Sequence, residues 1–413
     1  MLWMIENRNW KGAGLAILIL VGLSLGVRGE GYRTKIEDSG RQYAVCVVKG
    51  TPYEMGRSLG ELMKPEATEV TTRILGAVQA DGNAEFSNEA LDRVWKTCEP
   101  HISQDFQEEM RGLADGSGLP LDLLKRVHMI PLVDDYSCSS IAVWGKASEK
   151  GDLYVTRNLD WILDLKAHDF PCIVVYLPEK GIAHVNVSFA GYIGCNTGFN
   201  AKGIALSEMG DSPAKDKPYD LNGTHFTMLF RDILSRDTTL DQVLDRLNKT
   251  KRIKKYHYVF GSGQEKKAVK IKAHAPELLI WPDNDPTDER APNVLENCVY
   301  EDGGRGAFPL LKQDYGKHNA QTIIAISKAI PIKGNNVLNV VYNATAFECW
   351  VSYAREKTEA YTLPYVHIDC KPYLDFSKPV GALVARTGQP AIVPQAPLKP
   401  GESKFTEFTK EAE

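Results

Sequence analysis

The chain has 413 residues, of which 43% are hydrophobic and 25% charged, and its formal net charge is −4 at pH 7. This composition is typical of a globular protein with enough apolar material for a sizeable core. A charge balance this close to neutral excludes the basic surface of a nucleic-acid-binding domain. The one basic cluster, at 249–258, is interpreted as a solvated helix end and turn.

The N-terminus differs from the rest of the chain. Residues 15–26 are a short apolar run that follows Arg8 and Lys11 and precedes small and polar residues, a pattern typical of a secretory signal peptide. The run is shorter than the roughly 20 residues of a membrane-spanning helix. We therefore expect residues 1–29 to be a signal peptide for a secreted, periplasmic or lysosome-like location. A retained membrane anchor is the alternative.

Residues 30–137 form a segment that reads mainly as helix. A short strand begins at residue 41 and ends in a turn at 50–52, which a helix follows. Apolar residues recur at helical spacing through the rest of the segment, and Pro65 is a possible break. The expected helices cover 52–63, 65–80, 87–118 and 119–133.

From residue 138 onward the pattern changes to strands separated by turn residues. The expected strands are 138–145, 152–161, 169–178, 182–190, 203–209, 256–263, 267–275, 277–282, 337–344 and 347–354, and the expected helices are 225–249, with a second helix starting at Thr239, and 319–329. This order predicts an α+β fold in which antiparallel sheets stack and helices lie outside. The segment spans 138–385, and the Pro- and Lys-rich residues 386–413 are expected to be a flexible tail.

Several familiar sites are absent from the sequence. None of the eight cysteines has zinc-finger spacing, and there is no G-x-S-x-G elbow, phosphate-binding loop, HExxH or dinucleotide fingerprint. We therefore expect no metal and no organic cofactor. A papain-like Cys–His pair would need His257 or His367 beside Cys138, and the sequence does not choose between them.

Cys138 stands at the start of the first expected strand, in YSCSSIAVW, and charged residues follow it in TRNLDW. Arg157 and Asp160 lie on opposite faces of a regular strand, so a turn or bulge after Leu159 would be needed for them to converge. Alone, this pair fits a surface ion pair equally well. Further on, SFAGYIGCNTGFNAKG contains glycines that allow tight turns around Asn200, which also fits a left-handed turn.

Together these motifs resemble the N-terminal-nucleophile cysteine hydrolases, in the penicillin acyltransferase-like (C45-type), choloylglycine hydrolase and acid ceramidase branches. The resemblance covers residues 42–376 and includes GTPYEMGRSLGELM, VVYNATAFECWVSYA and LPYVHIDCKPYLDF. It implies a four-layer αββα sandwich behind a helical N-terminal segment. It also implies that the inactive chain cuts itself between Ser137 and Cys138.

The resemblance further assigns roles to site residues. Cys138 would be the nucleophile, and its freed α-amine, with an ordinary pKa of about 7.7–8.0, would be the general base. Arg157 would favour the thiolate, and Asp160 would orient the new ammonium group. Asn200 would lie near the oxyanion.

Two later residues are implied less directly. A second oxyanion donor in these families is an Asn after the middle strands, and Asn297 is the best match, although Cys298 stands where the acyltransferases have His. A late arginine contributes in some branches, and Arg305 is the candidate.

The expected activity is therefore cleavage of a linear amide of an N-acyl substrate, or transfer of its acyl group, through an acyl-enzyme on Cys138. The substrate would be a small molecule or a lipid, with no nucleic acid involved. The two chains made by self-cleavage would stay associated, and a Cys46–Cys370 disulfide is the hypothesis for a covalent link between them. They could also form a homo-oligomer. The alternative is an uncleaved, non-catalytic binding protein on the same fold.

Overall fold

The computed structural model describes residues 29–80, 82–134, 136–210, 220–275, 277–332 and 335–381. The expected signal peptide, except for its last residue, and the expected tail lie outside these described residues. Within them, no helix combines the length and the apolar character that crossing a bilayer requires.

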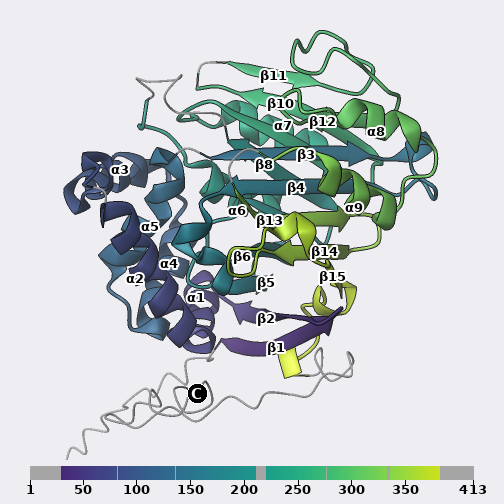
Figure 1. Ribbon diagram of the computed structural model, residues 1–413. Coiled ribbons are helices and arrows are strands. Elements are labelled where there is room, and N and C mark those ends of the chain that lie inside the picture. Colours follow the sequence, from purple (N-terminus) through teal and green to yellow (C-terminus); the bar gives the residue numbers. More distant parts are fainter. Residues whose placement is uncertain are drawn as a thin grey trace, which may run out of the picture.

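Two sheets form the centre of the molecule (Figure 1). The first has nine strands in the order β1-β2-β5-β6-β7-β8-β9-β10-β11, and the second has six in the order β12-β3-β4-β13-β14-β15. Among the described strands only β2 and β5 pair in parallel. The strands are β1 Glu30–Asp38, β2 Arg41–Gly50, β3 Ser137–Val143, β4 Tyr154–Trp161, β5 Pro171–Pro178, β6 His184–Phe189, β7 Thr197–Asn200, β8 Ile204–Gly210, β9 Tyr256–Ser262, β10 Lys267–Ala273, β11 Leu278–Trp281, β12 Cys298–Glu301, β13 Asn335–Asn343, β14 Glu348–Tyr353 and β15 Val366–Asp369.

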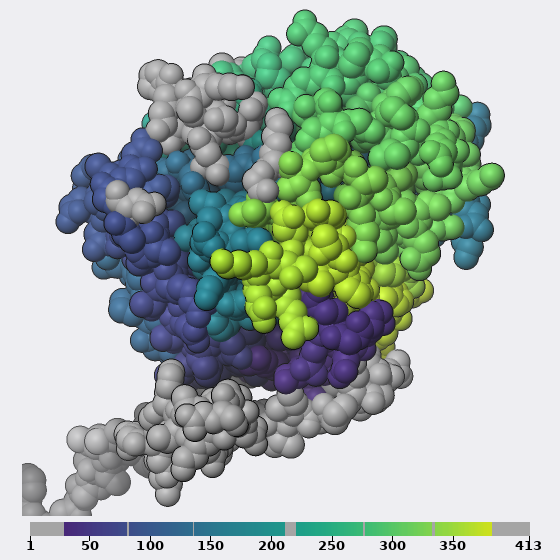
Figure 2. All heavy atoms as spheres, in the orientation of Figure 1, coloured from purple at the N-terminus to yellow at the C-terminus, as the bar shows by residue number. Residues whose placement is uncertain are grey.

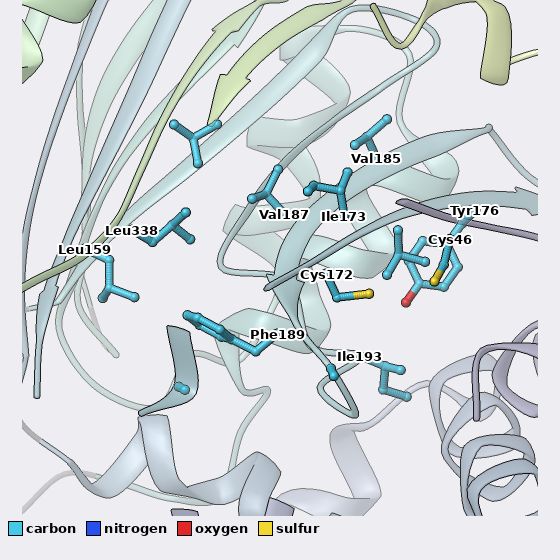
Figure 3. Packing of buried hydrophobic residues seen from close by; sticks show 14 of the residues in the cluster. Cys46, Leu159, Cys172, Ile173, Tyr176, Val185, Val187, Phe189, Ile193 and Leu338 are labelled. Atoms are coloured by element: carbon cyan, nitrogen blue, oxygen red, sulfur yellow. The ribbon is translucent and has the colours of Figure 1, made fainter. Parts of the chain in front are cut away.

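The sheets stack face to face and share one apolar core. Leu159 and Leu338 from the six-stranded sheet belong to the same buried cluster as Val187 and Phe189 from the nine-stranded sheet (Figure 3). On the outer face of the nine-stranded sheet lie α6 (Phe226–Arg236) and α7 (Leu240–Lys249). On the outer face of the six-stranded sheet lie α8 (Ala307–Gln313) and α9 (Ala320–Ala329). The predicted α+β, four-layer αββα architecture is confirmed.

In the described part of the chain, five α-helices precede β3 and gather at one end of the sheets (Figure 1). They are α1 Pro52–Leu62, α2 Lys64–Ala80, α3 Asn88–Cys98, α4 Gln104–Ser117 and α5 Leu121–Val133. Thr51 and Glu54 form a capping box at the start of α1, which satisfies amide groups that the first helical turn leaves free.

The prediction of a single helix over 87–118 is wrong. The chain leaves the helix after Cys98, and a short 3₁₀ turn that contains Pro100 follows. A new helix then begins where the Ser103 side chain accepts a hydrogen bond from the amide of Phe106. The break expected near Pro65 is present, because α1 ends at Leu62 and α2 begins at Lys64. Pro65 lies in the first turn of α2, where its missing N–H removes no helical hydrogen bond. The strand β1 was not foreseen at all.

Candidate active site

Cys138 is the second residue of β3 and is only 5% exposed. The register of β3 against β4 places Cys138 opposite Leu159 and Ser137 opposite Asp160. The scissile bond expected from the sequence therefore lies within a paired strand, at its first link. Side chains alternate along β4, so Arg157 and Leu159 share the face of Cys138, and Asp160 lies on the other face.

On the inner face, between the sheets, Arg157 reaches the Cys138 thiol. Its Nη2 atom lies 3.4 Å from Cys138 Sγ and 3.3 Å from Glu208 Oε2, and its Nε atom donates to the Glu208 carbonyl at 3.1 Å. The Tyr136 hydroxyl donates to Glu208 Oε1 at 2.9 Å. Arg157 and Glu208 are fully buried. One guanidinium thus connects the thiol to a carboxylate of the opposite sheet.

Burial governs the protonation of both Cys138 and Glu208. It raises the pKa of the Cys138 thiol to about 12, although the charge of Arg157 opposes the shift. Burial also raises the pKa of Glu208 to about 7, again against Arg157. In the uncut chain the thiol is therefore neutral at pH 7, while Glu208 changes protonation near that pH.

On the outer face, a second arginine connects Asp160 to the backbone of Cys138. Asp160 Oδ2 accepts from Arg305 Nη1 at 2.8 Å, and Oδ1 accepts from Asn336 Nδ2 at 3.1 Å. Arg305 Nη2 also donates to the backbone carbonyl of Cys138. Arg157 and Asp160 therefore do not converge through a bulge in β4 but hold Cys138 from opposite faces. The irregularity lies in β13, between Asn336 and Leu338.

The two predicted oxyanion residues lie outside this group. Asn200 is buried at the end of β7, where its side chain donates to the carbonyls of Leu234 and Asp237 at 3.0 and 2.9 Å. Its Oδ1 accepts from the amides of the following turn. It therefore ties β7 to the end of α6, which corrects the expectation that it faces an oxyanion.

Asn297 is placed at the far end of β3. Its carbonyl accepts from the amide of Trp144, and its Oδ1 accepts from the amide of Lys146 at 2.9 Å. Because Cys298 pairs with Val143, Asn297 lies at the opposite end of β3 from Cys138. The expected role as oxyanion donor does not fit this position.

An apolar pocket opens beside the strand neighbours of Cys138. It encloses about 660 Å³ of empty space, open solvent included. Two of its lining residues are neighbours of Cys138. Tyr136 precedes Cys138 by two residues, and Leu159 lies opposite it in the paired strand. The helices α2 and α5 and the loop before β7 form its walls, with Val70, Thr71, Ile74, Val127, Ile130, Pro131, Trp161, Phe189, Ala190, Gly191, Tyr192 and Asn196.

The cysteines are free thiols, and their arrangement corrects one hypothesis. Cys370 Sγ lies 3.8 Å from Cys349 Sγ, so it does not face Cys46. Cys46 instead contacts Cys172, where a thiol–thiol hydrogen bond raises the pKa of Cys172. Among the residues that the structure describes, no cluster of His, Cys, Asp or Glu has the form of a metal site.

Sequence reasoning missed Glu208, Tyr136 and Asn336, and it named Arg305 only as a candidate. Glu208 had a visible signal, because a carboxylate interrupts an otherwise apolar strand in IALSEM. A charged side chain is rarely buried in an apolar strand unless a residue of opposite charge pairs with it. The partner, Arg157, comes from the other sheet, which no local pattern reveals.

Comparisons with known proteins show what the chain is similar to. Residues 147–285 match the model of the family acyl-coenzyme A:6-aminopenicillanic acid acyl-transferase. Protein dcd1B of Dictyostelium discoideum is 27% identical over 290 residues, which cover 65% of this chain and 58% of that protein. The N-acylethanolamine-hydrolyzing acid amidase of Mus musculus is 25% identical over 194 residues, covering 45% of this chain and 51% of that protein.

A solved structure, the Caenorhabditis elegans ortholog of N-acylethanolamine-hydrolyzing acid amidase, aligns with a TM-score of 0.39 and 16% identity. The alignment covers 50% of this chain and 93% of that one. The chain spans 58% or less of the length of the two curated relatives described above. The family model and these relatives show that the chain is similar to proteins of the N-terminal-nucleophile hydrolase superfamily.

Proposed function

We propose that the chain is an autoprocessing cysteine amidase that cleaves a linear amide of an N-acyl substrate, or transfers its acyl group, through Cys138. The observation that carries the proposal is the 3.4 Å contact between Arg157 Nη2 and the buried Cys138 Sγ, directly beside an apolar pocket. A guanidinium is the neighbour that stabilises a thiolate, and apolar walls suit an acyl chain.

The first step is self-cleavage. Cys138 Sγ attacks the Ser137 carbonyl carbon, the Ser137–Cys138 amide breaks, and a thioester forms on the same residue. Water then hydrolyses the thioester, which leaves the Ser137 carboxylate, the free thiol and a free α-amine. In the uncut chain Cys138 has no α-amine, so another group must accept the thiol proton. Glu208 is the candidate, because its pKa of about 7 suits a general base near neutral pH.

The second step is amide cleavage by the processed enzyme. The α-amine of Cys138 accepts the thiol proton, and the thiolate attacks the substrate carbonyl while the amine product takes a proton and leaves. Water, or an acceptor amine, then releases the acyl group. Asp160 lies opposite Ser137 in the strand register, so its carboxylate stays beside the new terminus. Arg305 holds both Asp160 and the Cys138 carbonyl.

Mass spectrometry of the purified protein tests the first step. We expect a fragment that begins CSSIAVWG, and we expect Cys138→Ala to yield neither this fragment nor amide turnover. Cys298→Ala is a matched control, since it removes a buried thiol in the partner strand of β3, and it should still be cut. Two chains from Cys138→Ala would show that an outside protease makes the cut. An uncut wild-type chain without turnover would favour the binding-protein alternative.

The substrate class follows from the pocket and the relatives. The mouse relative is named for hydrolysis of N-acylethanolamines, and the pocket walls here are almost entirely apolar. We therefore expect long-chain N-acyl amides to be cleaved faster than N-acetyl amides in a substrate panel. The same proposal includes the location of the protein. The N-terminal signal would direct it to secretion, to the periplasm or to a lysosome-like compartment.

A further inference from the structure

One tyrosine hydroxyl contacts the buried carboxylate of the site. Tyr136 precedes Cys138 by two residues, and its hydroxyl donates to Glu208 Oε1 at 2.9 Å. Burial and the charge of Glu208 hold the pKa of this hydroxyl well above its ordinary value, so it stays protonated and can donate. Its ring lies against Gly210, where a Cβ atom would come within 3.0 Å of three ring carbons. Tyr136 is therefore fixed at both its ring and its hydroxyl.

Glu208 is the carboxylate on the thiol side of β3. Arg157 Nη2 contacts both Glu208 Oε2 and Cys138 Sγ, at 3.3 and 3.4 Å. The other carboxylate of the site, Asp160, lies on the opposite face and is bonded by Arg305. In the uncut chain, which has no α-amine at Cys138, Glu208 is therefore placed to take the thiol proton, directly or through one water.

Charged and titratable groups from several elements face Glu208. Burial raises the pKa of Glu208 to about 7, while Arg157 from β4, the hydrogen bond from Tyr136 and Lys254, which precedes β9, all lower it. The other titratable neighbours are Cys138 from β3, Tyr192 from the loop before β7 and Tyr258 from β9. Among these groups, Tyr136 alone lies on the N-terminal side of the proposed cut.

We propose that Tyr136 is a positioning residue for self-cleavage: its hydroxyl holds the Glu208 carboxylate as the acceptor of the Cys138 thiol proton. The proposal rests on the function proposed above. Glu208 takes the proton from Sγ, Sγ bonds to the Ser137 carbonyl carbon, and the proton passes to the amide nitrogen as the Ser137–Cys138 bond breaks. After the cut the α-amine of Cys138 accepts the thiol proton, so turnover needs neither Glu208 as a base nor Tyr136 to position it.

Tyr136→Phe tests the proposal, because it removes the hydroxyl and keeps the ring. The loss of a donor to a charged acceptor should raise the pKa of Glu208, so the pH at which self-cleavage is half-maximal should move up by about one unit. The rate should fall about tenfold at pH 6 and change little at pH 9. A short labelling pulse in cell-free translation, followed by transfer to buffers from pH 5 to 9, gives the rate of the cut on a denaturing gel.

Tyr300→Phe is the matched control. It removes the hydroxyl of another buried tyrosine, which donates to the Asn293 carbonyl at 3.0 Å outside the site, and it should keep the wild-type cleavage rate and pH midpoint. Turnover of an N-acyl amide by processed Tyr136→Phe enzyme can change in rate, because Tyr136 also lines the pocket. The pH midpoint of turnover should match the wild type, because the α-amine is then the base.

The outcomes separate this inference from the proposed function. If Tyr136→Phe is cut at the wild-type rate, or is slowed equally at every pH, Tyr136 does not position Glu208 and the proposed function stands. If the midpoint of turnover moves as far as that of cleavage, Glu208 serves both steps and the inference is wrong. If the wild-type chain is not cut, the proposed function fails and this inference fails with it. Should Tyr136→Phe not fold, Gly210→Ala, whose Cβ atom displaces the ring, should raise the cleavage midpoint, and an unchanged midpoint would contradict the inference.

Discussion

At the scale of single residues, strand alternation explains how the site is divided. Cys138 and Arg157 share the inner face, and Asp160 occupies the outer face. The two charged residues therefore contact different atoms, with Arg157 at the Cys138 thiol and Asp160, through Arg305, at the Cys138 carbonyl. The sequence suggested Arg157, Asp160 and Arg305, but it could not show that Arg305 connects Asp160 to the backbone of Cys138.

Glu208 leads to a prediction about pH and stability. Burial raises its pKa from 4.5 to about 7 on folding, so the folded state holds the proton more tightly than the unfolded state. The stabilisation from this group is complete below pH 4.5 and is lost as pH rises through 7, on the order of 3 kcal/mol. Glu208→Gln, made in the uncleavable Cys138→Ala background, stays neutral and should not show this loss.

Urea unfolding at pH 4.5, 6 and 8 measures the difference. Glu208→Gln leaves Arg157 without its counter-charge, so its free energy of unfolding should be lower overall. The informative quantity is the pH slope, and the variant should lose less stability than its parent between pH 4.5 and 8. Glu89→Gln, at an exposed position, is the control and should run parallel to the parent. Parallel curves for Glu208→Gln would contradict the assigned pKa.

At the scale of elements, α1 and α4 cross with almost no space between their backbones. Gly56 and Gly60 of α1 and Gly112 and Gly116 of α4 lie four residues apart, so each pair shares one helix face. A Cβ atom on Gly112 would overlap the carbonyl oxygen of Tyr53. The small residues let the backbones approach, much as small-xxx-small pairs do in other closely packed helices.

Alanine substitutions test this contact. Gly112→Ala should lower the free energy of unfolding by about 3 kcal/mol, because a backbone atom cannot move aside as a side chain can. Gly76→Ala, in α2, is the matched control, since a Cβ there meets nothing within 4 Å. It should raise stability by up to ~1 kcal/mol through helix propensity alone. Equal effects of the two substitutions in urea unfolding would show that the helices can separate without cost.

At the scale of the whole molecule, local patterns predicted more of the fold than of the site. The period-2 runs after Cys138 predicted strands that are confirmed, and most of these strands have one or both faces buried in the stacked sheets, whereas β11 is partly exposed. The short strands β7 and β12 were missed, since four residues carry little periodicity. Asn200 and Asn297 were assigned to the oxyanion region from sequence motifs alone. Their side chains bond groups outside the site instead: Asn200 bonds carbonyls at the end of α6, and Asn297 bonds the amide of Lys146 and the carboxylate of Asp283. Only the register of β3 with β12 reveals how far Asn297 lies from Cys138.

Residues 30–137 and the chain from Cys138 onward form one packed body, and the earlier segment also contributes β1 and β2 to the nine-stranded sheet. Figure 2 shows the helices (purple to blue) against the later chain without a gap. Residues from both sides of the proposed cut line the pocket. Two ion pairs join α4 to α6. The pair Glu109–Arg231 is buried and bidentate, at 2.9 and 2.7 Å, whereas Asp105–Arg236 is exposed.

These contacts predict that the two chains stay together after cleavage. Size-exclusion chromatography should give one species, and a denaturing gel should separate two chains without reductant, since the thiols are free. Glu109→Ala leaves Arg231 buried without a counter-charge and should destabilise the processed complex by about 3–5 kcal/mol. Asp105→Ala, in the exposed pair between the same helices, should change stability by less than about 1 kcal/mol. If both variants behave alike, the buried pair does not hold the chains together. If the chains separate only with reductant, a peptide map should show a disulfide across the cut, and Cys46–Cys172 is the pair placed to form it.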